Sequence, residues 1–132
     1  MKIFLSHKFT GEDVEELKIK LGKIKNTLEN SGHSVFCSIT KKKYFQEQAW
    51  SKNYIYQYCL KKQENCDIIL SFIHSEHKSL GMEKELKKAI NINQKIILAI
   101  PKQLNFSHFR EKANKIIEYS ELEQLCEEIN KI

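Results

Sequence analysis

Two short segments in the second half of the chain are apolar at almost every position. They are DIILSFI, residues 67–73, and KIILAI, residues 95–100. A strand that is hydrophobic on both faces must be covered from both sides, as the central strands of a parallel sheet are. Parallel neighbours need a crossover connection, and residues 80–92 between the two segments have helical spacing. The two segments therefore predict an α/β fold.

Three more segments have the composition of strands: KIFLS (residues 2–6), SVFCS (residues 34–38) and KIIEY (residues 115–119). The strands alternate with helical patterns along the chain. We therefore predict a flavodoxin-like or Rossmann-like three-layer α/β sandwich, with a parallel sheet in the strand order 2-1-3-4-5. Because 132 residues suffice for one core but not for two, residues 1–132 should form a single domain.

The first helix has the clearest boundaries. Apolar residues recur at intervals of three or four from Val14 to Leu28, and Gly32 follows as a stop signal. Thr10 and Asp13 have the spacing of a capping box at its start.

The other helices are placed by the same signals. We expect residues 39–50 to form a loop that enters a second helix ending near Asn65. The third helix covers residues 80–92. Ser120 and Glu123 have capping-box spacing at the start of a last helix.

Composition narrows the class of protein. The net charge is +5, yet Arg110 is the only arginine among 22 basic residues. Nucleic-acid readers depend on arginine for bidentate contacts, so we expect no nucleic-acid partner. The longest apolar runs are only a few residues, so no segment should span a membrane.

The cellular setting follows from two further signals. The opening MKIFL runs directly into polar SHKFTGED, which indicates a strand and not a secretion signal. The four cysteines show no CxxC motif and no Cys/His zinc spacing, and in a reducing cytosol they should be free thiols. We expect a cytoplasmic protein with free thiols.

The predicted fold places a site before any motif is considered. Ligands of open α/β sheets bind beyond the carboxyl ends of the strands, where the strand order reverses. In this chain that point lies between residues 2–6 and 67–73. The loops concerned are SHKFTGED, residues 6–13, and HSEHKSLG, residues 74–81. Glu85 follows in the helix that the second loop opens.

Glu85 is the candidate catalytic residue. The positive end of the helix should keep its carboxylate ionised, which suits a nucleophile or an electrostatic stabiliser. A single carboxylate of this kind can act at C1′ of a nucleoside, where N-glycosidic cleavage passes through an oxocarbenium-like state. Gly81 would allow close approach of a ligand, and Ser79 would offer a donor. A charged, capped helix start without a ligand is the alternative.

The loop after the first strand supplies further candidates. Ser6, His7 and Lys8 leave the sheet at the same edge, and the last two could contact a base or a phosphate. For stacking on a nucleobase the candidates are Phe9, Tyr44 and Phe45. We expect no metal site, because no carboxylate or cysteine completes a set with the nearby histidines.

Four stretches together resemble the nucleoside 2-deoxyribosyltransferase-like superfamily, which includes deoxynucleoside-monophosphate N-glycosidases. They are KIFLS…TGED, GHSVF, CDIILSFI and SLGMEKEL…A, within residues 2–100. The resemblance implies that Glu85 is the catalytic glutamate, that Ser79 and Gly81 contact the 5′ side of the sugar, and that residues 6–9 line the nucleoside pocket. It implies no cofactor.

The chain departs from this family at one position that matters. Many members carry an aspartate in the helix before the third strand, where it helps to handle the base. Cys59 stands at the matching position.

A second resemblance is to TIR domains, through FLSHKFTGED and SEHKSLGMEKEL. Some TIR domains cleave NAD with an equivalent glutamate. The loop after the second strand lacks the proline-glycine signature that is typical of them.

Three hypotheses follow. The first is an enzyme that cleaves or transfers the N-glycosidic bond of a (deoxy)nucleoside or its 5′-monophosphate. The second is a TIR-like NAD hydrolase or signalling domain, and the third a catalytically silent flavodoxin-like module. By analogy with such enzymes, and from the aromatic stripe of Trp50, Tyr54 and Tyr58, we also expect a homodimer built on the second and third helices.

Overall fold

The computed structural model describes residues 1–9 and 11–132. Its strands form one parallel sheet in the order β2-β1-β3-β4-β5, which confirms the predicted fold class and strand order. The strands are β1 (Lys2–His7), β2 (Ser34–Cys37), β3 (Ile68–Phe72), β4 (Lys95–Pro101) and β5 (Lys115–Tyr119).

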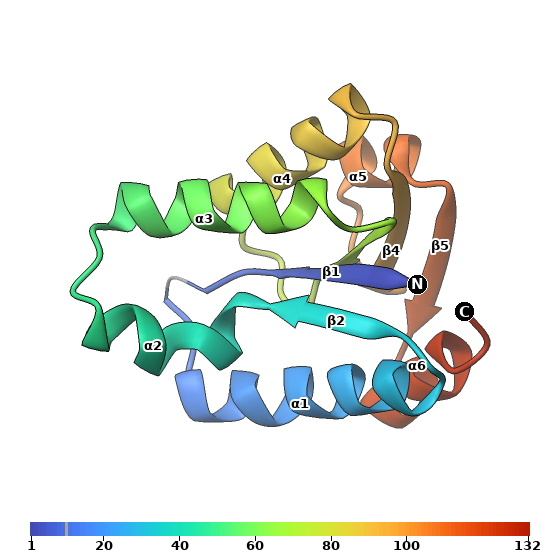
Figure 1. The fold of residues 1–132 in the computed structure, drawn as a ribbon. Coiled ribbons are helices and arrows are strands. Elements are labelled where there is room, and N and C mark those ends of the chain that lie inside the picture. The colour runs from blue at the N-terminus through green and yellow to red at the C-terminus, as the bar shows by residue number, and fades with distance from the viewer. Residues whose placement is uncertain (10) are drawn as a thin grey trace.

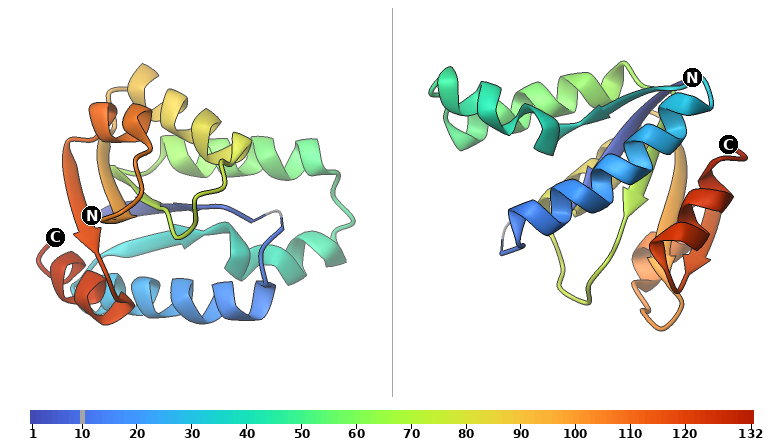
Figure 2. Two further views of the ribbon diagram at one scale, coloured as in Figure 1. Left: turned by 180° about the vertical axis from the view of Figure 1, so that it is seen from behind. Right: turned by 90° about the horizontal axis from the view of Figure 1, so that it is seen from below.

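Helices cover both faces of the sheet, as the apolar central strands require (Figure 1). On one face lie α1 (Val14–Asn30) and α6 (Leu122–Ile129), and on the other lie α3 (Lys52–Glu64), α4 (Leu80–Asn91) and α5 (Ser107–Lys112). The view from behind in Figure 2 shows the sheet between these two layers. Within the described part of the chain, no helix combines the length and apolarity needed to cross a bilayer.

The sheet divides the core into two halves. All five residues of β3 are buried, and alternate side chains enter opposite halves. Leu70 packs with Leu21 and its neighbours under α1 and α6, whereas Ile69 packs with Phe4 and Leu86 under α3 and α4. The cysteines are free thiols, of which Cys37 and Cys59 are buried.

The segment predicted as a loop is partly helical, so that prediction is wrong. Residues 39–50 contain the 3₁₀ turn η1 (Ser38–Lys41) and the helix α2 (Lys42–Glu47). The Thr40 hydroxyl donates to the Cys37 carbonyl and closes the turn. The helix buries only Phe45, so its sequence carries no repeating apolar pattern.

A second short helix, α5, was not predicted for the same reason: its one buried side chain is Phe109. Both capping boxes are also wrong as predicted. Asp13 itself caps α1 by accepting from two backbone N–H groups, and Thr10 lies outside the described residues. At α6 the backbone N–H of Ser120 donates to Gln124 and not to Glu123, because the helix begins two residues after Ser120.

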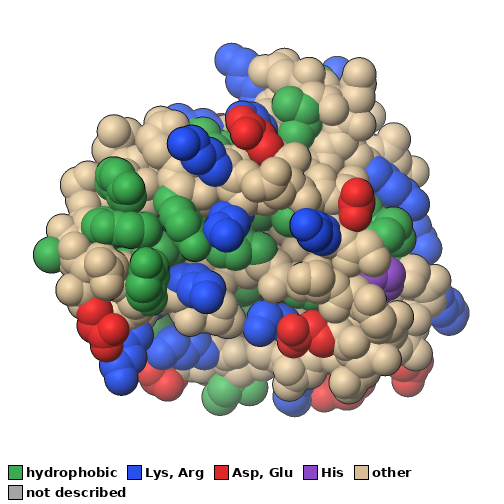
Figure 3. All heavy atoms as spheres, viewed as in Figure 1, with side chains coloured by type: hydrophobic (Ala, Val, Ile, Leu, Met, Phe, Trp, Pro, Cys, Tyr) green, Lys and Arg blue, Asp and Glu red, His purple; other side chains and the backbone are tan. Residues whose placement is uncertain are grey.

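Charged side chains are spread over the surface. Figure 3 shows basic side chains distributed over one face with acidic ones among them. Hydrophobic side chains gather on the same face, where α2 passes into α3.

Candidate active site

A cleft of about 400 Å³ opens at the carboxyl end of β1, between α2, α3 and the start of α4. It lies at the predicted switch point of the sheet. Five of the seven predicted site residues line it: His7, Phe9, Ser79, Gly81 and Glu85.

Glu85 enters the cleft from the second turn of α4. The helix begins at Leu80 because the Ser79 hydroxyl caps it, accepting from the Met82 backbone N–H at 3.2 Å. This start sets which side chains face the sheet, and Glu85 is directed towards β1. There the Ser6 hydroxyl donates to Glu85 Oε1 at 2.6 Å. The carboxyl group is therefore held in one orientation.

The environment of Glu85 changes its ionisation. Burial raises the pKa of its carboxyl group from 4.5 to about 7, and the hydrogen bond from Ser6 opposes this rise. The expectation of a carboxylate kept ionised by the helix end is therefore wrong. A helix terminus contributes about 0.3–1 kcal/mol, whereas a rise of this size corresponds to about 3 kcal/mol, so desolvation outweighs the helix.

A buried amide braces the backbone behind Glu85. Gln63 of α3 is fully buried, and its side-chain amide donates to the Glu85 carbonyl oxygen at 2.7 Å. The same amide donates to Gln94 Oε1 at 3.1 Å, and Gln94 in turn donates to the carbonyls of Gln63 and Cys66. This network fixes α4 against α3 and thereby fixes the acid.

His7 is neutral and fully engaged. Its Nδ1 lies 3.1 Å from the Lys8 carbonyl oxygen, which can only accept, so Nδ1 carries the hydrogen. Nε2 is then an acceptor, and it receives the Ser38 hydroxyl at 3.1 Å. Burial lowers the pKa of His7 to about 4, and nearby His74 adds to the decrease. In this arrangement both ring nitrogens are used within the protein, so donation from His7 to a base or phosphate stays a prediction.

Ser6 and Lys8 do not line the cleft. Ser6 is buried beneath Glu85 and positions it. Lys8 pairs with Glu12 at 3.2 Å and lines a much smaller neighbouring cavity, because β1 ends at His7 and the chain turns away. Ser6 therefore lies under Glu85 and Lys8 faces a separate cavity, and direct substrate contact by either residue stays a prediction.

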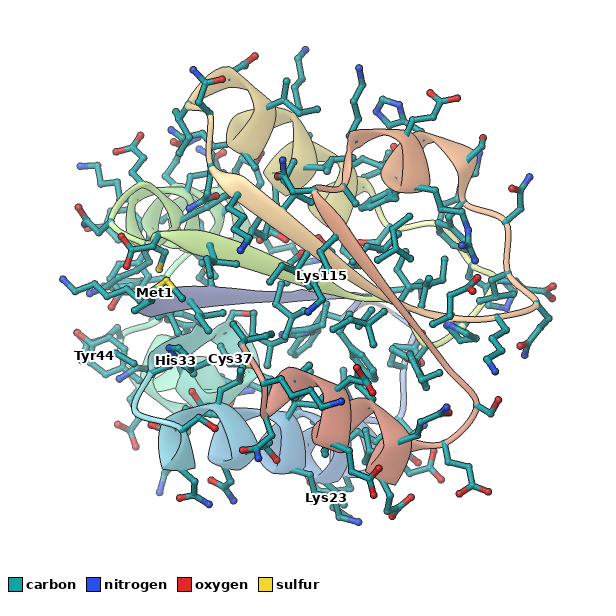
Figure 4. The ribbon with its side chains drawn as sticks, turned by 90° about the vertical axis from the view of Figure 1, so that its right-hand side faces the viewer. Met1, Lys23, His33, Cys37, Tyr44 and Lys115 are labelled. Atoms are coloured by element: carbon teal, nitrogen blue, oxygen red, sulfur yellow. The ribbon has the colours of Figure 1, made fainter. Side chains whose placement is uncertain are left out.

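The aromatic candidates divide in the same way. Phe9 and Phe45 line the cleft, and Phe45 forms part of its apolar wall. Tyr44 does not line the cleft, although it is next to Phe45 on the same helix. Its side chain is exposed and lies at the edge of the molecule in Figure 4. Tyr44 and Phe45 belong to α2 and not to a loop.

Most of the opposite wall was missed at the level of sequence. Ser38 and Lys42 line it after β2, and Lys52, Ile55, Tyr56 and Cys59 line it from α3. The α3 residues follow the spacing i, i+3, i+4 and i+7, which places them on one helical face. That spacing was the available signal, but it mixes charged, aromatic and apolar residues and so resembles no standard amphipathic pattern.

Metal binding has no geometric basis within residues 1–9 and 11–132. No group of three His, Cys, Asp or Glu side chains there is arranged to hold an ion. The nearest acidic partner of His74 is Glu12, with 4.0 Å between Nδ1 of the histidine and Oε2 of the glutamate.

Comparison with known proteins supports the architecture. No family profile and no curated protein sequence matches the chain. Among solved structures, the CMP N-glycosidase BcmB of Clostridium botulinum is similar, with a TM-score of 0.75 at 18% identity over 99% of this chain and 98% of that one. The 2-deoxyribosyltransferase of Bacillus psychrosaccharolyticus has a TM-score of 0.71 at 17% identity, over 95% and 90%. At these identities the similarity establishes a shared fold.

The raised pKa of Glu85 predicts how stability depends on pH. The folded chain binds the Glu85 proton up to about pH 7, whereas the unfolded chain loses it near 4.5. Stability should therefore fall as pH rises from 4.5 to 7 and then level off. Glu85→Gln removes this loss, so we expect it to raise the free energy of unfolding by about 2–3 kcal/mol at pH 8 and by little at pH 4.5.

Urea denaturation at the two pH values measures the effect. Glu83→Gln is the matched control, because Glu83 lies on the same helix outside the cleft. An equal gain for both variants, or a gain for Glu85→Gln that does not depend on pH, would contradict the assignment.

Proposed function

We propose that this chain belongs to the nucleoside 2-deoxyribosyltransferase-like superfamily and cleaves or transfers the N-glycosidic bond of a nucleoside or its 5′-monophosphate. One observation carries the proposal: a single glutamate, Glu85, faces a cleft of about 400 Å³ at the switch point and is fixed there by Ser6. The similar folds of an N-glycosidase and a deoxyribosyltransferase support it.

The chemistry follows from the position of the acid. Cleavage of the bond from C1′ to the base leaves positive charge on the sugar. The ionised form of Glu85 stabilises that charge or bonds to C1′, and water or a second base then completes hydrolysis or transfer. A pKa near 7 means that about half of the Glu85 groups are ionised at neutral pH.

The start of α4 is the proposed site for the 5′ end of the sugar. The first N–H groups of a helix have no partner within it, and they favour a hydroxyl or a phosphate. Ser79 and Gly81 line the cleft within two turns of Glu85. A nucleoside with its 5′ group at this end would place C1′ beside the acid.

Release of free base from a substrate panel tests the proposal. The panel contains deoxynucleosides, ribonucleosides, their 5′-monophosphates and NAD. We expect a free purine or pyrimidine, and we expect Glu85→Gln to lower the rate by at least about 10³-fold while Glu83→Gln leaves it unchanged. Nicotinamide as the only product would indicate the NAD hydrolase instead. No product from any substrate would indicate a silent module.

The hydrogen bond from Ser6 predicts a shift in the pH–rate profile. Because this bond lowers the pKa of Glu85, Ser6→Ala should move the acid limb of kcat/KM to higher pH. Activity at pH 7 should fall about fivefold and recover above pH 9.

Ser71→Ala is the matched control for this shift. Ser71 is buried beside Ser6 in the adjacent strand, and within the described part of the chain its hydroxyl has no hydrogen-bond partner. An acid limb that stays in place in Ser6→Ala, with activity lost equally at all pH values, would contradict the proposed role.

We also propose a homodimer built on α3 and α4. Tyr54 of α3 is 56% exposed and Tyr44 of α2 is 43% exposed, and both contact the ring of Trp50 between the two helices. Light scattering at micromolar concentration should give twice the monomer mass, and Tyr54→Lys should lower it. A monomer in both cases would refute the dimer.

A further inference from the structure

The described lining of the cleft combines one carboxyl group with two lysines. Among its described lining residues, Glu85 is the only carboxyl group, and Lys42 and Lys52 are the cationic ones. Lys42 enters from α2, with its ammonium group 5.5 Å from the centre of the Phe9 ring, and Lys52 enters from the start of α3. Both lysines stand on the wall opposite the start of α4.

We propose that the base leaves this cleft as an anion stabilised by Lys42 and Lys52, so that the preferred substrates carry oxo-pyrimidines of the uracil class. This inference rests on the proposed function and names its substrate class. Glu85 supplies an electron pair to C1′, and the electron pair of the C1′–N1 bond goes to N1 of the base. The base then takes a proton from water, and a second water hydrolyses the sugar ester.

The orientation of the nucleoside follows from the two ends of the cleft. The start of α4 supplies N–H groups for the 5′ end, and Glu85 lies between it and the wall formed by α2 and α3. The base then faces Phe45 and Ile55, and Lys42 and Lys52 line the cleft on the same side. Negative charge that develops on the O2 and O4 oxygens of a uracil is stabilised by cations beside it. Lys42 is partly buried in the cleft, and Lys52 is exposed at its edge.

The alternative is protonation of the base by a side chain. Glu85 has a pKa near 7, but the proposed mechanism uses its ionised form at C1′, so the same group cannot also protonate the base. Among the other described lining residues, the candidate donors are His7, Cys59 and Tyr56. His7 uses both ring nitrogens within the protein, and its pKa of about 4 keeps it neutral. Burial raises the pKa of the Cys59 thiol to about 12, with a further contribution from Glu85. Burial and then Glu85 also raise the pKa of Tyr56. An efficient general acid at neutral pH needs a pKa close to 7.

Nucleobases differ in whether they must be protonated before they leave, so the missing proton donor predicts a preference among bases. Uracil is an imide-type acid and can leave as an anion, and a 5-fluoro group makes it a better leaving group at nearly the same size. Cytosine and adenine carry amino groups and leave readily only after protonation. A cleft in which Glu85 acts at C1′ and neither His7, Cys59 nor Tyr56 protonates the base therefore favours uracil-type bases.

The test compares substrates that differ only in the base, which is 5-fluorouracil, uracil or cytosine. The sugar and the 5′ group are those of the substrate that the wild-type chain cleaves fastest. We expect kcat/KM for the 5-fluorouracil substrate to exceed that for uracil by about tenfold, and that for uracil to exceed that for cytosine by at least about tenfold. Equal or faster release of cytosine would overturn the inference. Release of no base from any substrate would instead refute the proposed function.

Lysine variants test the stabilising groups. Lys42→Met and Lys52→Met should each lower kcat/KM for the uracil substrate by roughly 10-fold to 100-fold, and less for 5-fluorouracil, whose anion needs less stabilisation. Lys42→Arg should retain most of the activity. Lys43→Met is the matched control, because Lys43 is exposed, adjacent on α2 and outside the cleft.

A phosphate is the other anion that these lysines could bind. Each variant is therefore assayed with the nucleoside and with its 5′-monophosphate. Equal losses for both support stabilisation of the base. A loss confined to the monophosphate would show that the lysines hold the phosphate and would overturn the inference.

Discussion

The hydrogen bond from Ser6 to Glu85, at 2.6 Å, joins two residues that are 79 positions apart in the chain. It exists only because β1 and β3 are neighbours in the sheet, with Ser6 level with Ser71, so that the helix following β3 begins above the end of β1. On its other side the Glu85 carbonyl is held by Gln63. The acid is therefore fixed from the sheet and from α3, and the shape of the cleft depends on both contacts.

Desolvation is the dominant electrostatic effect in this cleft. Glu85 lies near the positive end of α4, yet its pKa rises to about 7. The same burial keeps His7 neutral through a pKa of about 4. Positive charge enters the cleft mainly from Lys42 and Lys52 at its opposite wall. A substrate that places an electron-poor carbon beside Glu85 and an electron-rich group beside the lysines matches this distribution.

The sequence predicts well those elements that have a long regular apolar spacing or that are apolar on both faces. β3 and β4 were placed by apolar residues on both faces, and α1 by its regular spacing from Val14 to Leu28. α2 and α5 bury one side chain each, so they leave no pattern. The position of the site was predicted from the reversal of strand order between the first and third strands, and from Glu85 in the helix that follows the third strand. The role of Ser6 depended on strand register, and the pKa of Glu85 on tertiary burial, neither of which spacing reveals.

Cys59 connects the architecture of the cleft with its chemistry. The resemblance to deoxyribosyltransferases implies an aspartate at this position of α3, which here faces the same cleft as Glu85. A second carboxylate so close would repel Glu85 and raise the pKa of at least one of the pair. The thiol is 7% exposed and neutral, since its pKa is about 12. It fills the wall without adding charge, and it cannot act as an acid near pH 7. The neutral thiol on α3 and the two lysines on the same wall act in the same direction, since both favour a leaving group that carries negative charge.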